Sequence, residues 1–222
     1  NGQHGTKAVV ITGMSGTGKS QLAIEFAYRY AYLYPGGVFW LNFAKAGNID
    51  EQVASLGEPQ GLNLFSDNDR QPLARKVAQV RRAWQQQVPR LLIFDNCDDE
   101  ALVSDWLPVA GAGCVLITSR QAHWPITLPL KTLPLHALNR VDSIAILNHF
   151  RDSLTEHEAN HIATSVGDLP LALHLAGSYL RRYPNESISS YLEQLGRQHL
   201  LEHVSLKGSH TRYSPTGLEL SV

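Results

Sequence analysis

The chain has 222 residues, of which 43% are hydrophobic and 18% charged, and this balance excludes an intrinsically disordered protein. Its 19 basic and 20 acidic residues leave a net charge of −1, so no overall field favours nucleic acid or an anionic membrane as a partner. No run approaches the roughly eighteen apolar residues of a membrane span. Two cysteines, Cys97 and Cys114, cannot build a disulfide framework, so we expect a cytoplasmic globular protein.

The first part of the chain alternates short apolar runs with helical patterns. Residues 7–12 are β-branched and end at a glycine-rich turn, after which Leu22, Phe26 and Tyr30 recur at steps of four. Such alternation predicts a five-stranded parallel sheet with helices on both faces. The expected strands are 7–12, 38–43, 91–95, 114–118 and 126–130, and the expected helices are 18–33, 50–56 and 73–84.

After residue 133 only helical patterns remain, over residues 142–150, 155–166, 169–183 and 187–201. Thr155 and Glu158 form a capping-box sequence, and Pro170 suits the first position of a helix. We therefore predict a small all-helical domain behind an α/β domain. The expected divisions are residues 1–133 for nucleotide binding, residues 134–205 for the helical domain, and residues 206–222 as a connector.

A phosphate-binding motif joins the first predicted strand to the first predicted helix. The segment GMSGTGKS, residues 13–20, matches G-x-x-x-x-G-K-[ST]. Its glycines let consecutive backbone N–H groups converge on phosphate oxygens at a helix N-terminus. Lys19 is expected to bridge the terminal phosphates, and Ser20 to bind Mg²⁺. The residues expected to contact the nucleotide here are Gly13, Met14, Ser15, Gly16, Thr17, Gly18, Lys19, Ser20 and Gln21.

A magnesium site of this kind needs a carboxylate at the end of a neighbouring strand, and Asp95 ends the run LLIFD. Asn96 follows, where hydrolysing enzymes place an acid that activates water; an amide can orient a water but cannot take its proton. Asp98 and Asp99 are nearby substitutes, although a solvated acidic turn is the favoured interpretation. These residues predict slow hydrolysis.

Arg120 closes the fourth predicted strand in the sequence Thr-Ser-Arg. If this strand lies between the first and the third, its tip faces the end of a bound triphosphate. A guanidinium there would contact the γ-phosphate through charge-assisted hydrogen bonds. Lys19, Asp95 and Arg120 are thus the candidate catalytic residues. A surface arginine in a loop is the alternative.

Taken in order, these segments resemble the NB-ARC domain of the signal-transduction ATPases with numerous domains. The matches are residues 13–20, VFWL at 38–41, residues 91–99, residues 114–120, and GDLPLAL at 167–173, where Asp168 departs from the family pattern. The resemblance implies an ADP/ATP switch with Mg²⁺, in which nucleotide exchange controls oligomerisation and effector activation. It also implies that Pro170 packs on the adenine, and His174 lies one helical turn further on.

Two departures from the family set expectations about the rest of the protein. The family's Gly-Arg segment before the first strand is missing, and residues 216–222 look like the opening of a winged-helix domain. The expected partners are therefore the nucleotide and the winged-helix and C-terminal sensor domains of a longer chain, besides a second copy of the chain in the ATP state.

The motifs can also be compared with what three other functions require. A constitutive AAA-like ATPase would need a catalytic acid beside Asp95, a small-molecule kinase would need an arginine-rich lid, and an interaction module would not need an intact Lys19 and Ser20. His157 and His161 match the zinc-protease pattern H-E-x-x-H, but a capping box that occupies Glu158 is the favoured interpretation.

Overall fold

The computed structural model describes residues 7–44, 46–66 and 69–197. This part of the chain divides into two compact units. The first comprises residues 7–13 and 19–135, and the second comprises residues 14–18 and 136–197. The predicted connector, residues 206–222, lies outside the described residues. No helix among the described residues combines the length and apolarity needed to cross a membrane.

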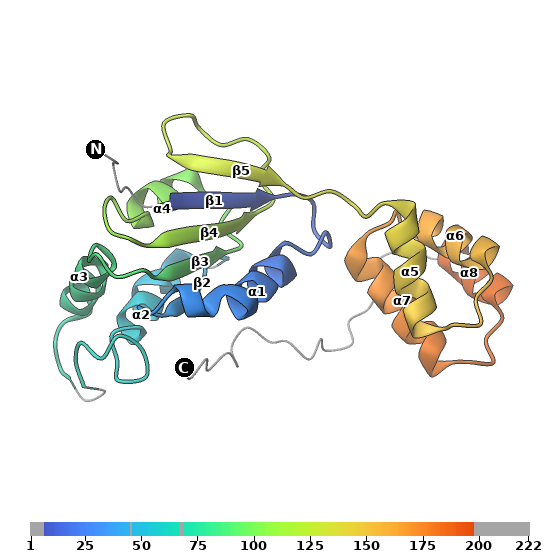
Figure 1. Cartoon of the computed structure of the whole chain (residues 1–222), viewed down its shortest axis with the longest axis horizontal. Helices are drawn as coiled ribbons and strands as arrows, with labels where there is room; N and C mark the ends of the chain where they lie inside the picture. The colour runs from blue at the N-terminus through green and yellow to red at the C-terminus, as the bar shows by residue number, and fades with distance from the viewer. Residues whose placement is uncertain (1–6, 45, 67–68, 198–222) are drawn as a thin grey trace. The chain divides into compact units, whose positions relative to one another are not determined.

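A parallel five-stranded sheet forms the centre of the first unit, as predicted. Its order is β2-β3-β4-β1-β5, and every pairing is parallel; Figure 1 shows β5, β1 and β4 side by side. The apolar runs place β3 entirely in the core, as expected for a central strand covered on both faces. The strands are β1 (Lys7–Thr12), β2 (Val38–Asn42), β3 (Leu91–Asp95), β4 (Cys114–Ser119) and β5 (Leu130–Pro134).

Alternate residues of β3 enter two different hydrophobic clusters, so both faces of the sheet are covered. Leu91 and Ile93 belong to the cluster of helix α1 (Lys19–Tyr30). Leu92 and Phe94 belong to the cluster that contains buried residues of the helices on the other face. Those helices are α2 (Ile49–Ser55), α3 (Leu73–Trp84) and α4 (Glu100–Trp106), and two short 3₁₀ turns, η1 (Ala31–Leu33) and η2 (Ala46–Asn48), complete the unit.

One expectation for this unit was wrong. The sequence pattern predicts the fifth strand at residues 126–130, but β5 begins at Leu130, where its register with Ala8 starts, and Ile126 is fully exposed. Asp99, in the acidic stretch predicted to be a solvated turn, is exposed and also caps α4 by accepting hydrogen bonds from two backbone amides. Val103 and Trp106 anchor that short helix in the core, three residues apart.

The second unit is helical over residues 136–197, and its four helices surround one apolar core. The predicted capping box is confirmed: Thr155 accepts from the Glu158 amide, and the Glu158 carboxylate accepts from the Thr155 amide at 2.9 Å. Pro170 occupies the first turn of its helix, as predicted. The helices are α5 (Arg140–Phe150), α6 (Glu156–Ser165), α7 (Pro170–Arg182) and α8 (Ile188–Arg197).

Asp168, which departs from the family pattern, has a structural role in this unit. Its φ is 55°, a left-handed conformation that Asp tolerates better than most residues. Its carboxylate accepts from Arg140 Nε at 2.9 Å and from Nη2 at 2.7 Å. Arg140 also donates to Asn160 and Thr164 of α6. The pair therefore joins the start of α5 to α6 and to the turn before α7.

Candidate nucleotide-binding site

The loop between β1 and α1 has a backbone that requires glycine at two positions. Gly16 has a φ of 83° and Gly18 a φ of 91°, both in the left-handed region. Thr17 closes the turn, because its hydroxyl donates to the Met14 carbonyl at 2.8 Å. Met14, Ser15 and Gln21 are exposed at the ends of this segment. The motif thus adopts a strand–loop–helix arrangement, the context that a phosphate-binding loop requires.

Lys19, the first residue of α1, is buried, and its Nζ donates to the Gly13 carbonyl at 2.8 Å. Burial lowers the pKa of the Lys19 ammonium group; the nearby Asp98 carboxylate opposes this shift, and the Arg120 guanidinium adds to it. Lys19 therefore shares an electrostatic environment with residues that follow β3 and β4.

Asp95 and Ser20, the two predicted magnesium ligands, lie together. Ser20 Oγ donates to Asp95 Oδ1 at 2.6 Å, and Thr118 Oγ1 donates to the same oxygen at 2.6 Å. Asp95 is 4% exposed. A hydroxyl and a carboxylate are hard oxygen donors of the kind that Mg²⁺ takes, and it is usually held by one or two protein ligands together with substrate phosphates. The donor set therefore fits Mg²⁺.

Asn96 is held next to this carboxylate rather than directed away from it. Its Nδ2 donates to Asp95 Oδ2 at 3.2 Å, and its backbone N–H donates to Thr118 Oγ1 at 3.0 Å. The φ of Asn96 is 57°, and asparagine is among the residues that accept this conformation. The sequence patterns did not predict that Thr118 would donate to Asp95. The parallel pairing of β3 and β4 explains this contact, because it brings both strand ends to one edge of the sheet.

Asp98 and Arg120 form an ion pair beside these groups, which corrects the expectation of a solvated acidic turn. Asp98 Oδ2 lies 2.6 Å from Arg120 Nη2 and accepts from Arg120 Nε at 2.7 Å. Asp98 Oδ1 accepts from the Arg120 amide at 2.7 Å and from Ser119 Oγ at 2.9 Å. Burial alone would raise the pKa of Asp98, but these hydrogen bonds outweigh it and lower the pKa.

The remaining two predicted contacts lie in the helical unit. Pro170 is partly buried at the start of α7. His174 is exposed, and its ring packs edge-on against Phe150 of α5, with 5.1 Å between centroids. Among the described residues, no group of three or more His, Cys, Asp and Glu side chains is arranged to hold a metal ion.

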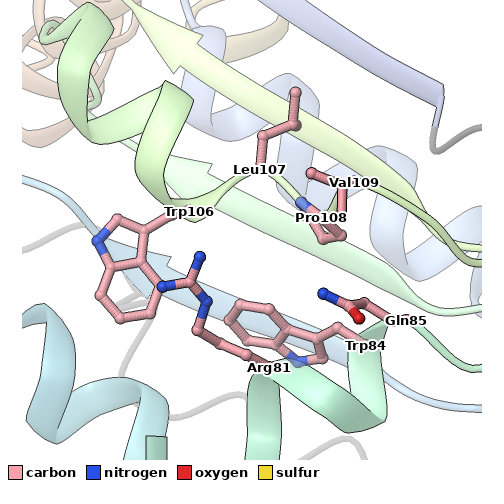
Figure 2. A pocket seen from close by; sticks show the side chains of 7 residues that line it. All are labelled: Arg81, Trp84, Gln85, Trp106, Leu107, Pro108 and Val109. Carbon is pink, nitrogen blue, oxygen red and sulfur yellow. The ribbon is translucent and has the colours of Figure 1, made fainter. Parts of the chain in front are cut away.

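A separate small cavity lies in the first unit, between α3 and the segment that follows α4. Figure 2 shows the side chains of Arg81, Trp84 and Trp106 around it, and the Arg81 guanidinium lies 5.1 Å from the Trp106 ring centroid. Its volume is about 40 Å³, far below the roughly 300–1,000 Å³ of small-molecule sites. None of the predicted site residues lines it.

Comparisons with known proteins agree with the motifs. No family model matches the chain. A nucleotide-binding leucine-rich repeat (NLR)-like protein of Hyaloscypha variabilis is 25% identical over 89% of this chain and 22% of its own length. The regulatory protein AfsR of Streptomyces coelicolor is 24% identical over 77% of this chain and 18% of its own length. The chain thus spans about a fifth of the curated relatives it matches.

The fold also matches solved structures. Cdc6p from Pyrobaculum aerophilum aligns with a TM-score of 0.59 and 13% identity, over 81% of this chain and 57% of that one. An identity this low supports the P-loop NTPase fold alone. The two relatives, at about a quarter identity, support the resemblance of the ordered motifs to the NB-ARC-type P-loop NTPase domain of the signal-transduction ATPases with numerous domains.

Proposed function

We propose that this domain binds ADP and ATP with Mg²⁺ and acts as the nucleotide switch of a larger signalling protein. The observation that carries the proposal is the cluster at the carboxyl edge of the sheet, where the hydroxyls of Ser20 and Thr118 both donate to Asp95 Oδ1. Lys19 follows the glycine loop, and Arg120 follows the neighbouring strand. These are the donor types that bind and neutralise a nucleoside polyphosphate.

Each residue has a distinct role in this proposal. The amides of residues 13–18 and the N-terminus of α1 bind the phosphates, and Lys19 supplies a buried positive charge. Ser20 and Asp95 would hold Mg²⁺, which supplies charge neutralisation when bound. Pro170 packs on the adenine, with His174 one turn along the same helix.

The same geometry predicts slow hydrolysis. Asp95 and Asp98 both accept several hydrogen bonds, and the pKa of Asp98 is lowered, so neither carboxylate is suited to take a proton from water. Asp99 caps α4, and Asn96 has an amide in place of an acid. A switch that persists in one nucleotide state needs this slowness, whereas a constitutive AAA-like motor needs rapid turnover.

A switch also needs contacts that differ between its two states. Arg120 supplies one, because a guanidinium at the tip of β4 can contact a third phosphate that ADP lacks. In the ATP state, we propose, the larger protein exchanges contacts with its further domains and oligomerises.

The test is calorimetric titration of the chain and of Arg120→Ala with ADP and with a non-hydrolysable ATP analogue, both with Mg²⁺. We expect the variant to lose roughly ten- to a hundredfold in affinity for the ATP analogue and little for ADP. Equal losses for the two nucleotides would show that Arg120 supports the fold rather than the γ-phosphate. The nucleotide released from purified protein by denaturation, identified by chromatography, should be an adenine nucleotide.

A further inference from the structure

The Asp98 carboxylate contacts the last residue of β4, Ser119, and the residue after it, Arg120. It accepts one hydrogen bond from Ser119 Oγ and two from Arg120, through the backbone amide and Nε, and Arg120 Nη2 adds an ion-pair contact at 2.6 Å. The two carboxylate oxygens have different partners. Oδ1 accepts from Ser119 Oγ and the Arg120 amide, and Oδ2 contacts the Arg120 guanidinium. The carboxylate therefore both fixes the loop after β4 and neutralises the charge of Arg120.

The two partners are not equally anchored. The Asp98 side chain is 30% exposed and tied to a backbone amide, whereas the Arg120 side chain is 68% exposed. The carboxylate is thus the fixed partner, and the guanidinium is the one that can leave. Asp98 also acts on Lys19 more strongly than Arg120 does, as the causes of the lowered Lys19 pKa show.

We propose that Asp98 is a positioning residue that competes with the third phosphate of ATP for Arg120 and thereby sets the preference between ATP and ADP. This inference rests on the proposed contact between Arg120 and the γ-phosphate. ADP can bind while the ion pair stays intact. ATP must draw the Arg120 guanidinium away from Asp98. Part of the free energy gained when Arg120 contacts the third phosphate is therefore spent on breaking the Asp98–Arg120 ion pair.

Asp98→Asn separates the two roles of the carboxylate, which are to hold the loop after β4 and to pair with the Arg120 guanidinium. The asparagine Oδ1 can still accept from Ser119 and from the Arg120 amide, while its NH₂ group replaces Oδ2 and cannot accept from the guanidinium. Asp98→Ser, which retains one acceptor, is a second variant with the same expectation. Asp99→Asn is the matched control, because it removes the same charge one residue away and leaves an oxygen to cap α4.

The measurement is calorimetric titration of each variant with ADP and with a non-hydrolysable ATP analogue. For an ion pair this exposed, Asp98→Asn should raise the ratio of ATP to ADP affinity roughly two- to fivefold. Asp99→Asn should leave the ratio unchanged. In an Arg120→Ala background, Asp98→Asn should no longer change the ratio, since the competition acts through the guanidinium.

The possible failures are distinguishable. If Arg120→Ala lowers the ratio but Asp98→Asn leaves it unchanged or lowers it, Arg120 contacts the third phosphate and Asp98 does not compete for it. If Arg120→Ala weakens both nucleotides equally, the proposed switch contact is wrong and the competition falls with it. An equal rise in Asp98→Asn and Asp99→Asn would assign the effect to local charge alone.

Discussion

The Ser20 hydroxyl donates to Asp95 Oδ1 at 2.6 Å, although the two residues are 75 positions apart in the chain. Ser20 lies in the first turn of α1, after β1, and Asp95 ends β3, with β4 between these two strands. The fold alone therefore assembles the two proposed magnesium ligands. Because the hydrogen bond already orders both groups, little side-chain entropy remains to be lost when an ion binds.

Lys19→Ala should weaken the binding of a fluorescent ADP analogue by roughly ten- to a hundredfold, because it removes a charge-assisted contact with the phosphates. Lys131→Ala is the matched control, since Lys131 is exposed on β5 and carries the same charge. It should bind as the unmodified chain does. Equal affinities for all three proteins would refute the phosphate-binding assignment of the glycine loop.

Asn96→Asp should raise the rate of phosphate release at saturating Mg²⁺, because it adds a carboxylate able to act as a general base. Without Mg²⁺ it should lower the melting temperature, since the donor 3.2 Å from Asp95 Oδ2 becomes a like charge. Asn63→Asp makes the same change at an exposed residue with a φ of 50° and should alter neither quantity. An unchanged rate with intact Mg²⁺ binding would show that the missing acid does not limit hydrolysis.

Thr155→Ala should destabilise the protein by about 1 kcal/mol, the usual cost of losing an N-cap. His157→Ala lies on the same helix and should change the unfolding free energy by less than about 0.5 kcal/mol. Denaturant unfolding measures both. Elemental analysis should find no stoichiometric zinc; zinc that disappears in His157→Ala would overturn the capping-box interpretation of H-E-x-x-H.

Two replacements of Asp168 should distinguish the stability contributed by its ion pair with Arg140 from the cost of its left-handed backbone conformation. Asp168→Gly retains the left-handed conformation and loses the contact with Arg140, at a cost of about 1 kcal/mol. Asp168→Ala should cost about 1 kcal/mol more, because alanine is strained at a φ of 55°. Unfolding of the two variants side by side measures the difference; equal stabilities would mean that backbone strain is absent.

The same ion pair should make stability depend on pH. Hydrogen bonds from Arg140 lower the pKa of Asp168 below its ordinary 3.8, so the unfolded chain takes up this proton at a higher pH than the folded one. The stabilisation is therefore complete above about pH 5 and is lost as the pH falls through the lowered value. The stability gap between the unmodified chain and Asp168→Gly should close in acid. A gap that is constant from pH 7 to pH 3 would contradict this linkage.

Local patterns predicted most of the sheet because each buried strand is a short apolar run between turn signals. The run LLIFD became β3 as expected, and the capping sequence at Thr155 became a capped helix. Ile126 misled the prediction because its apolar side chain suggested a strand, whereas pairing with β1 begins only at Leu130. The residues at which a strand begins and ends depend on its pairing with strands elsewhere in the chain, and local periodicity carries no information about that pairing.

The site residues likewise fall into those that local sequence patterns predicted and those that depend on distant contacts. The spacing of the glycine motif predicted Lys19 and Ser20, and the end of an apolar run predicted Asp95. The role of Asp98 could not be predicted, because it depends on the loop after β3 meeting the residue after β4. Thr118 was hidden for the same reason, since threonine at a strand end is common and only the register gives it a function.

The strand order has a consequence for folding during synthesis. Among the described strands β1 pairs with β4 and β5, so it has no sheet partner until about residue 119 has been made. β2 and β3 can pair some two dozen residues earlier. Contacts between distant segments form slowly because the intervening loop must first close. The glycine loop, which follows β1, is therefore translated well before its supporting strand β4, and a nascent chain that stops before β4 should bind no nucleotide.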